Sequence, residues 1–384
     1  MIPAEWLAAR RVLAVRLDNL GDVLLTTPAI RALRQSLPAA SLTLLASEVG
    51  AQVGRLNPDL HDVVVYAAPW MDPWGKLPLD SAREQQAIAA LAAGEYDAAV
   101  IFTSFRQSAL PAAYLCYLAG IPLRLAASID GPGSLLTIRH RHPERMMHEV
   151  ERGLDLAAAI GAATDDDRLV LDVPPLAYRE IEHLRGGERP LVVVHPGCSM
   201  PARTYPWEQY AAVISELVAA LDARVVVTGA SHERPLVAAI VDAVAPNARG
   251  RVRDAAGELS FPALCALIAA GDLTITNNTG PMHISAAVGT PVVALFALTN
   301  PPEQWGPWRV PHRMLWHEAP CRLCYSRICQ IGHECLRGVT PAQVVAAAAA
   351  LLTEQDGRVV EASTFSDSLH MPTPAARLQI GGSP

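Results

Sequence analysis

Residues 272–296 read DLTITNNTGPMHISAAVGTPVVALF, and this stretch decides the fold. The apolar runs 273–276 and 291–296 have the length and branching expected of buried strands. Between them a polar turn leads into a helical segment, in which Pro281 stands at a favoured first position and Gly289 closes the helix. A strand, a tight turn and a helix start leave free backbone N–H groups at the positive end of a dipole. The pattern predicts an anion site, most naturally for phosphate, and an ordinary strand-to-helix turn is the alternative.

The first half of the chain alternates apolar strands with helical segments. The predicted strands are 11–17, 42–46, 63–66, 98–102 and 123–125, and the predicted helices are one from Thr27-Pro28 to 37, a weak one ending at 56, 81–93 and 108–119. Strands this apolar indicate a parallel sheet that helices cover on both faces. Such sheets bind ligands beyond the carboxyl ends of their strands, and the loop 18–22 lies at such an end.

A second alternation follows a polar, breaker-rich join at 164–175. Its predicted elements are strand 191–194, helix 207–221, strand 224–227, helices 233–244 and 260–270, and the stretch quoted above. We therefore predict an α/β protein of two Rossmann-like domains, residues 1–175 and 176–355. The chain loses its periodicity from Asp356 onward, and we expect residues 356–384 to be a disordered tail.

Composition limits the class of protein. Hydrophobic residues make up 51% of the 384 residues and charged residues 18%, which is enough apolar material for a large core and excludes global disorder. A net charge of −7 argues against nucleic acid as the main partner. The N-terminus has no signal-peptide pattern, and no run approaches the ~20 apolar residues of a membrane span. We expect a cytoplasmic protein, with peripheral membrane contact left open.

Polar and charged residues follow several predicted strands. Asp22 can act as a general base on a hydroxyl, or it can cap the following helix. His195 ends the first strand of the second half and is expected to point into the same cleft. Arg203 precedes a helix and suits phosphate oxygens, with a solvated arginine packed on Trp207 as the alternative. His283 lies one turn into the helix behind the anion turn, where a histidine is more often a core group than a catalyst.

Three separated motifs carry a family resemblance. They are NNTGPMH at 277–283 with GTPVVALF at 289–296, RLDNLGDV at 16–23 with TPA at 27–29, and HPG at 195–197 with YPW at 205–207. In that order they resemble the donor-binding motif, the N-terminal motif and the third signature of the bacterial heptosyltransferase family, glycosyltransferase family 9. The similarity covers residues 11–352.

The resemblance implies a GT-B fold, in which two Rossmann-like domains face each other across the substrate cleft. The family transfers a sugar, typically heptose from ADP-heptose, to an acceptor hydroxyl with inversion and without a metal or other cofactor. The implied partners are a nucleotide-diphosphate sugar donor and a glycan or lipid-linked acceptor, with the lipopolysaccharide core as the family default. A transferase for another nucleotide sugar, a GT-B epimerase and a non-catalytic sugar-nucleotide-binding relative are the alternatives.

The resemblance implies roles for the residues of this sequence that stand at the family's motif positions. Asp22 matches the family's proposed base, in preference to neighbouring Asp18. Arg203 stands where members often have a lysine near the diphosphate, so the charge is kept with a different geometry. Glu233 matches an acidic group near the donor ribose.

The diphosphate turn also follows from the resemblance. Thr279, Gly280 and Met282 match it, and His283 lies beside it. Members commonly carry aspartate where this chain has Asn278, a change that removes a negative charge beside the diphosphate but keeps hydrogen-bonding groups. This departure bears on donor identity more than on activity.

Four cysteines form a C-x2-C-x4-C-x5-C cluster. They are Cys321, Cys324, Cys329 and Cys335. In a cytoplasmic chain clustered thiols suggest a metal before disulfides, so a structural zinc or iron–sulfur site is one hypothesis, and reduced thiols or a disulfide staple are the others.

Overall fold

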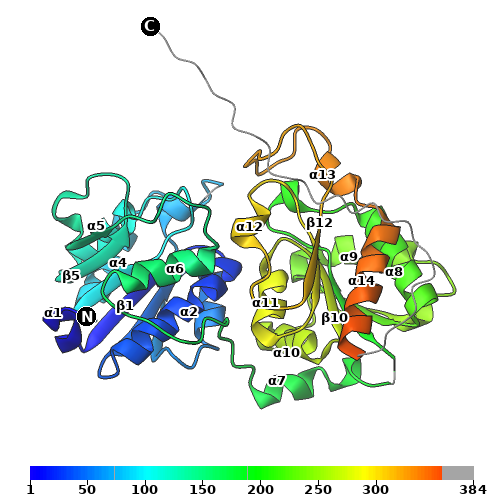
Figure 1. The fold of residues 1–384 in the computed structure, drawn as a ribbon, viewed down its shortest axis with the longest axis horizontal. Coiled ribbons are helices and arrows are strands. Elements are labelled where there is room, and N and C mark those ends of the chain that lie inside the picture. The colour runs from blue at the N-terminus through cyan, green and yellow to red at the C-terminus, as the bar shows by residue number, and fades with distance from the viewer. Residues whose placement is uncertain (73, 188, 357–384) are drawn as a thin grey trace, which may run out of the picture.

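The computed structural model describes residues 1–72, 74–187 and 189–356. It contains two six-stranded sheets whose paired strands are all parallel, each within its own α/β layer structure (Figure 1). Residues 357–384, which make up nearly all of the predicted tail, lie outside the described residues, so that prediction stays untested.

The N-terminal sheet has the strand order β3-β2-β1-β4-β5-β6. Its strands are β1 (Arg11–Arg16), β2 (Ser41–Ala46), β3 (Asp62–Val65), β4 (Ala98–Ile101), β5 (Leu123–Ala127) and β6 (Ile138–His140). The helices around it are α1 (Ala4–Ala8), α2 (Leu20–Ser36), α3 (Glu48–Gly54), α4 (Ser81–Ala93), α5 (Leu110–Leu118) and α6 (Glu149–Ala158), with 3-10 turns η1 (Pro69–Met71) and η2 (Gly133–Leu135).

The C-terminal sheet has the strand order β12-β11-β10-β7-β8-β9. Its strands are β7 (Leu191–His195), β8 (Arg224–Val227), β9 (Val252–Asp254), β10 (Leu273–Asn277), β11 (Val292–Leu295) and β12 (His312–Leu315). Its helices are α7 (Pro175–Glu180), α8 (Trp207–Leu221), α9 (Arg234–Ala243), α10 (Phe261–Ala270), α11 (Gly280–Val288), α12 (Pro302–Trp305), α13 (Glu334–Arg337) and α14 (Pro341–Asp356), with 3-10 turns η3 (Glu182–Leu184), η4 (Pro201–Arg203), η5 (Ser231–Glu233) and η6 (Arg249–Arg251).

The two sheets share one topology. Numbered within its own domain, each has the order 3-2-1-4-5-6, so the direction of winding reverses between β1 and β4 and again between β7 and β10. At these reversals the loops at the carboxyl ends of adjacent strands diverge and leave a crevice for ligands. The prediction of two Rossmann-like domains is confirmed, and the two crevices fix where a site can lie.

The domains meet through α2 and α11, which pack against each other at the junction (Figure 1). A Cβ placed on Gly21 would lie 2.6 Å from Cδ2 of His283, so glycine is needed for this close approach. A buried apolar cluster containing Leu25, Val150 and Met282 fills the space between the halves. The first turns of α2 and α11 are thereby held close together.

The division near residue 175 remains our proposal. It is supported by α7, which begins at Pro175 and packs on α10 of the C-terminal half (Figure 1). Within the described residues, no helix combines the length and the apolar character needed to cross a membrane.

One predicted helix start is wrong. Helix α2 begins at Leu20, not at Thr27-Pro28, and Pro28 lies inside it. A proline in a helix leaves the carbonyl four residues earlier without its usual N–H donor. Here the hydroxyl of Thr27 donates to that carbonyl, Leu24 O, at 2.7 Å. The helix therefore continues past its proline without an orphaned acceptor.

Candidate active site

A group of charged side chains lies where β1 ends and α2 begins. The guanidinium of Arg16 lies with Nε 2.8 Å from Oδ2 of Asp18 and with Nη2 3.4 Å from Oδ1 of Asp22. Glu149, the first residue of α6, places Oε2 3.7 Å from the same Nη2. Arg16 is thus shared among three carboxylates, of which Asp18 and Glu149 are buried and Asp22 is partly exposed. Arg152 adds a second cation beside Glu149, and the remaining surplus of negative charge favours proton uptake by one carboxylate.

Two polar residues from the loop after β4 complete this group. Ser104 accepts a hydrogen bond from Nη2 of Arg16 at 2.7 Å, and its hydroxyl lies 3.2 Å from Oδ1 of Asp22. Gln107 donates from Nε2 to Oδ1 of Asp18 at 2.7 Å. Because Arg16 and Gln107 engage both oxygens of Asp18, that carboxylate is fixed in place.

Asp22 differs from Asp18 in its setting. Its Oδ2 accepts the backbone N–H of Asn19 at 3.2 Å, so it closes the first turn of α2 as well as facing Arg16. Burial, reinforced by the charges of Asp18 and Glu149 and opposed by Arg16, raises the pKa of Asp22 to about 6. The side chain is 15% exposed, so a ligand can still reach it. A carboxylate with this pKa is suited to accept a proton near neutral pH.

The predicted anion turn lies across the domain junction from Asp22. Thr279 precedes α11 in an extended conformation, and its side chain does not cap the helix. The positive end of the α11 dipole is therefore left without a side-chain cap and can attract an anion, although the N–H of Met282 already donates to Thr279 O at 3.1 Å. A Cβ on Gly280 would lie 3.1 Å from Cδ2 of Leu20, which brings this turn close to the start of α2.

Arg203 adds a cation beside this turn. Its Nε donates to Oγ1 of Thr299 at 3.0 Å, and in the described part of the chain it forms no ion pair with a carboxylate. Burial lowers its pKa, with the charges of Cys198 and Asp22 acting in the opposite direction. The bond to Thr299 and the burial favour phosphate binding over a solvated loop arginine, and the role of Arg203 stays a prediction. A sheltered guanidinium without an anionic partner is suited to bind a phosphate.

Glu233 lies at the carboxyl ends of β7 and β8. Its Oε2 accepts the backbone N–H of Ala230 at 2.7 Å and lies 3.8 Å from Nε2 of His195. The carboxylate sits directly against Gly197, because any Cβ there would overlap it. Burial lowers the pKa of His195, whose Nδ1 faces Oγ1 of Thr228 at 3.0 Å. Glu233 is therefore held at the rim of the second crevice.

Two other predicted donor residues, Asn278 and Met282, are buried. Asn278 uses its side chain inside the protein: Nδ2 donates to Oδ1 of Asn300 at 3.2 Å, and Oδ1 accepts the N–H of Ala297 at 3.3 Å. Met282 has 1% exposure and packs in the apolar cluster between the domains, so its side chain is directed away from the turn. Their roles toward a donor remain predictions.

His283 occupies the junction itself. Its ring packs on Gly21, and its Nδ1 is buried without a hydrogen-bond partner in the described residues. Burial, together with the charges of His148 and Arg203, lowers the pKa of His283 to about 3. The imidazole is therefore neutral at physiological pH. A protonated His283 does not serve as a general acid there.

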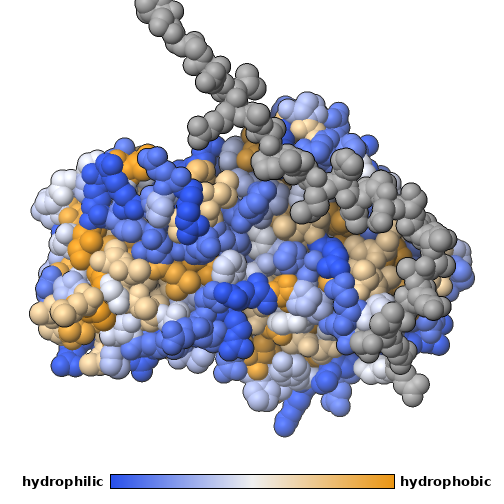
Figure 2. All heavy atoms as spheres, in the orientation of Figure 1, coloured by the Kyte–Doolittle hydropathy of each residue, from blue (hydrophilic) through white to orange (hydrophobic). Residues whose placement is uncertain are grey.

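A cavity of about 880 Å³ opens beside the carboxylate group. Its walls include Phe105, Arg106, Gln107, His142, Arg152 and Gln304. Three of these contact the carboxylates directly: Gln107 binds Asp18, while Arg152 and Gln304 lie 3.3 and 2.7 Å from Oε1 of Glu149. In the view of Figure 2, hydrophilic residues gather on the upper part of the N-terminal half, with apolar residues between them.

The four clustered cysteines are free thiols that lie near one another. Burial and the charges of Cys324 and Cys329 raise the pKa of Cys321, and burial and the charges of Cys321, Cys329 and Cys324 raise the pKa of Cys335. Within the described residues, no three of the four sulfur atoms lie within 4.8 Å of one another, so a structural zinc or iron–sulfur site stays a prediction. The segment packs beside Arg203 and Thr299, because Ala202 N–H donates to Arg327 O at 3.0 Å and Tyr325 N–H to Thr299 O at 2.9 Å.

Several residues of the site were not predicted to have a role. Arg16 carries a detectable signal, since a charged residue at the end of a buried strand, two positions before Asp18, requires a partner. Ser104 and Gln107 follow the strand next to β1, where the topology places the crevice. Glu149 comes from a helix far along the chain, and only the tertiary structure brings it to Arg16.

Comparison with known proteins identifies the family of this chain. A family model described as glycosyltransferase family 9 (heptosyltransferase) matches residues 86–334. Lipopolysaccharide heptosyltransferase 3 of Escherichia coli is 27% identical over 299 residues, covering 75% of this chain and 83% of the relative.

Solved structures agree in fold. The structure of E. coli ADP-heptose lipopolysaccharide heptosyltransferase II has a TM-score of 0.72 at 22% identity, covering 90% of this chain and 99% of that one. A glycosyltransferase family 9 structure from Veillonella parvula DSM 2008 has a TM-score of 0.73 at 21% identity, covering 90% and 98%. The predicted GT-B fold is confirmed, and the chain belongs to glycosyltransferase family 9, the heptosyltransferase family.

Proposed function

We propose that this protein is an inverting glycosyltransferase that moves heptose from ADP-heptose to a hydroxyl of a lipopolysaccharide core or related glycan. Two of the three proteins named above are lipopolysaccharide heptosyltransferases, and one of these, a solved structure, is named for ADP-heptose. The observation that carries the proposal is a base and an anion site on opposite sides of one domain junction. Asp22 supplies the base, and Arg203 with the start of α11 forms the anion site.

The chemistry follows from this placement. The donor diphosphate binds at the α11 turn and Arg203, which stabilise the charge that develops on the leaving group. Asp22 removes the proton of the attacking hydroxyl on the opposite face of the sugar, so one displacement inverts the anomeric carbon. The guanidinium and helix dipole supply the positive charge, and no step of this transfer is assigned to a metal ion. Glu233 is proposed to contact the donor ribose.

The acceptor is proposed to enter through the 880 Å³ cavity. That cavity borders Gln107 and Arg152, which contact the carboxylates around Asp22. A hydroxyl that reaches Asp22 from this side approaches from the N-terminal domain, opposite the donor turn. The glycan end of a lipid-linked acceptor fits this arrangement, with the lipid outside the cavity.

The function is tested by donor binding and transfer. In a thermal-shift panel of ADP-, UDP-, GDP- and CDP-sugars, an ADP-sugar at about 100 times its Kd should add ~2.7 kcal/mol to the free energy of unfolding. Mass spectrometry of a heptose-deficient core acceptor should then show the addition of one heptose. Stabilisation by a different nucleotide sugar alone would refute the donor assignment. Donor binding without transfer to any core acceptor would favour the non-catalytic alternative.

Arg203 is tested separately. Arg203→Ala removes a charged hydrogen-bond donor that is worth about 1.5–3 kcal/mol, so the Kd for ADP should rise about 10- to 100-fold. Isothermal titration calorimetry measures this change, and Arg179→Ala, at an exposed arginine on α7, is the control. An unchanged ADP affinity in Arg203→Ala would contradict the assignment.

A further inference from the structure

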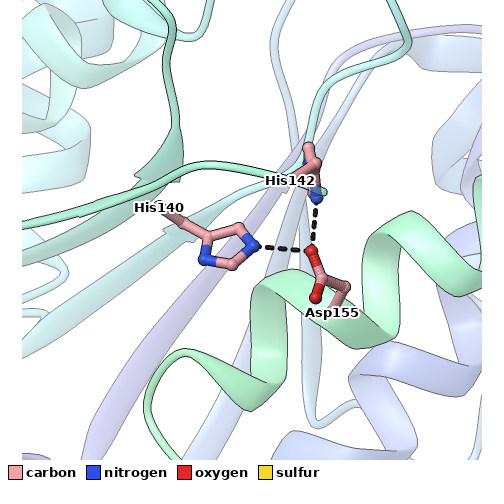
Figure 3. A group of neighbouring side chains, drawn as sticks. All are labelled: His140, His142 and Asp155. Carbon is pink, nitrogen blue, oxygen red and sulfur yellow. Dashed lines mark hydrogen bonds and ion pairs between the residues drawn. The ribbon is translucent and has the colours of Figure 1, made fainter. Parts of the chain in front are cut away.

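His140, His142 and Asp155 form a compact group that the proposed transfer does not use (Figure 3). His140 is the last residue of β6, His142 lies two positions further on, and Asp155 comes from α6. Nε2 of His140 and Nδ1 of His142 lie 2.6 and 2.7 Å from the same oxygen, Oδ2 of Asp155. Figure 3 shows the two imidazoles directed at that oxygen from different sides. In the described part of the chain, no other set of three metal-ligand side chains converges in this way.

Two imidazole nitrogens and one carboxylate oxygen are a donor set of the zinc class. Zinc binds such atoms at about 2.0–2.2 Å in a tetrahedron, which places ligand atoms ~3.3 Å apart. The three atoms here already lie within 4.8 Å of one another. To admit an ion, each nitrogen must move away from Oδ2 by ~0.6 Å, a displacement within reach of side-chain rotation. The ion then takes the place of the two hydrogen bonds to Oδ2, and each neutral imidazole carries its proton on its other ring nitrogen, Nδ1 of His140 and Nε2 of His142.

The group is sheltered but has one open side. The side chains of His140, His142 and Asp155 are 18%, 12% and 27% exposed. The two histidines line the 880 Å³ cavity, and Asp155 lies behind them on α6. Three protein ligands with a fourth position facing a cavity is the arrangement of zinc sites that accept water or a ligand.

The surrounding charges indicate what the fourth ligand is. Arg141, Arg145 and Arg152 line the same cavity, and Asp130 and Glu144 contribute the opposing negative charges. Asp155 alone does not neutralise a divalent ion, and the arginines repel one that carries no further anion. An anionic oxygen in the fourth position satisfies both the ion and the arginines.

We propose that His140, His142 and Asp155 bind a zinc-class divalent ion whose fourth coordination position opens into this cavity and takes an anionic oxygen. The site belongs to the N-terminal domain and is separate from the donor turn. It does not rest on the proposed transfer reaction, because its ligands and its cavity are described independently of the donor.

Cobalt(II) titration of the full-length chain tests this site. Cobalt replaces zinc and reports its ligands by absorption: a tetrahedral nitrogen and oxygen site gives d–d bands without a thiolate charge-transfer band. This distinction matters because the thiols of Cys321, Cys324, Cys329 and Cys335 can also bind cobalt. Titrating the Cys321→Ser, Cys324→Ser double variant limits that competing signal. The expected result is one equivalent of cobalt with the nitrogen and oxygen spectrum, displaced by zinc.

Matched variants decide the outcome. His142→Gln keeps a hydrogen-bond donor for Asp155 but removes the imidazole, and it should weaken cobalt binding by more than the ~10–100-fold that loss of an outer partner costs. His183→Ala, at an exposed histidine of η3, should leave binding unchanged. If the folded protein gives no nitrogen and oxygen spectrum, or if His142→Gln binds as tightly as the parent, the three residues are only a hydrogen-bonded group and the proposal is wrong.

Discussion

Asp18 and Asp22 lie four residues apart beside one guanidinium, yet their surroundings give them different roles. Arg16 and Gln107 engage both oxygens of Asp18. Asp22 is held by the Asn19 N–H and by the longer contact to Arg16, and its pKa is raised to about 6. A carboxylate whose pKa is raised toward neutral pH by burial and charged neighbours is typical of an acid–base site.

The first prediction concerns turnover. Asp22→Asn should lower kcat by ~10²–10⁴-fold with little change in ADP affinity, because the base is lost and the anion site is not. Asp18→Asn should cost much less, and it should also move the acidic limb of the pH–rate profile below about 6, since it removes a charge that raises the pKa of Asp22. Steady-state kinetics across pH measures both effects. If Asp18→Asn abolishes transfer while Asp22→Asn retains it, the roles are reversed.

The second prediction concerns stability. The folded-state pKa of Asp22 is about 6, against an ordinary value of 3.8. Between these values the folded chain binds the proton more tightly than the unfolded chain, so stability falls as pH rises through that window. Asp22→Asn cannot ionise, so above about pH 6 it should raise the free energy of unfolding by about 1–3 kcal/mol.

Urea denaturation at neutral pH and at about pH 4 checks the sign, because the gain should disappear in acid. Asp165→Asn, at an exposed carboxylate, is the control and should change little at either pH. A variant less stable than the parent at neutral pH would show that the contacts of Asp22 with Arg16 and Asn19 outweigh its burial.

At the scale of elements, the C-terminal crevice depends on one glycine. Where β7 ends, a turn containing Gly197 follows, and the carboxylate of Glu233 from η5 lies over it. The absence of a side chain at Gly197 is what allows Glu233 to reach the rim of the crevice.

The third prediction follows from that contact. Gly197→Ala places a methyl group where the Glu233 carboxylate lies, so the carboxylate must move and donor affinity should fall, by about 10-fold for one disturbed hydrogen bond of ~1.5 kcal/mol. Calorimetry with ADP and with inorganic diphosphate separates the ribose contact from the phosphate contact, and only ADP binding should weaken. Gly250→Ala, where a methyl meets open space, is the matched control. Equal loss for both ligands would place Glu233 near the diphosphate instead.

The strands that the sequence pattern did not predict are edge strands. The strands β6, β9 and β12 were not predicted, and each lies at an edge of its sheet. Their sequences IRH, VRD and HRML are short and contain charged residues, and none of their residues is fully buried. Central strands are covered on both faces and read as apolar runs, whereas an edge strand is defined mainly by pairing with its neighbour.

At the scale of the whole molecule, the cysteine-containing segment bridges the two domains. The guanidinium of Arg106, in the N-terminal domain, lies 4.4 Å from the ring centre of Tyr325. The guanidinium of Arg327 lies 5.8 Å from the ring centre of Trp74. The same segment is bonded through its backbone to the turns that carry Arg203 and Thr299. Opening of the cleft must therefore break these contacts or carry the segment along.

The fourth prediction tests this bridge. Tyr325→Ala removes a cation–π contact worth about 0.5–2 kcal/mol, which should favour a more open arrangement of the domains and speed the release of ADP. Small-angle scattering should show a larger radius of gyration, and stopped-flow fluorescence a faster ADP off-rate. Arg185→Ala, which removes the contact with Tyr178 on the C-terminal side of the molecule, is the control. An unchanged radius and off-rate in Tyr325→Ala would show that the bridge does not hold the domains.

Local sequence patterns predicted many of the strands and helices of this protein. The apolar runs of the central strands predicted two parallel sheets, and the helices 81–93 and 207–221 end where the structure ends them. Motif order identified the family, and Asp22, Arg203 and Thr279 were predicted as site residues from their places after a strand or before a helix. These features depend on neighbours in sequence, because strand burial and helix starts are set by the nearest residues.

The remainder depended on contacts between distant segments. Glu149 reaches Arg16 from α6, and Ser104 and Gln107 reach it from the loop after β4. The pKa of Asp22 follows from that assembly, because burial and the neighbouring charges arise only when α2, α6 and the β4 loop pack together. The pairing of His140 and His142 with Asp155 arises in the same way, since β6 and α6 meet only in the folded domain. Sequence determined which residues stand at the strand ends, and tertiary packing decided which charges face one another.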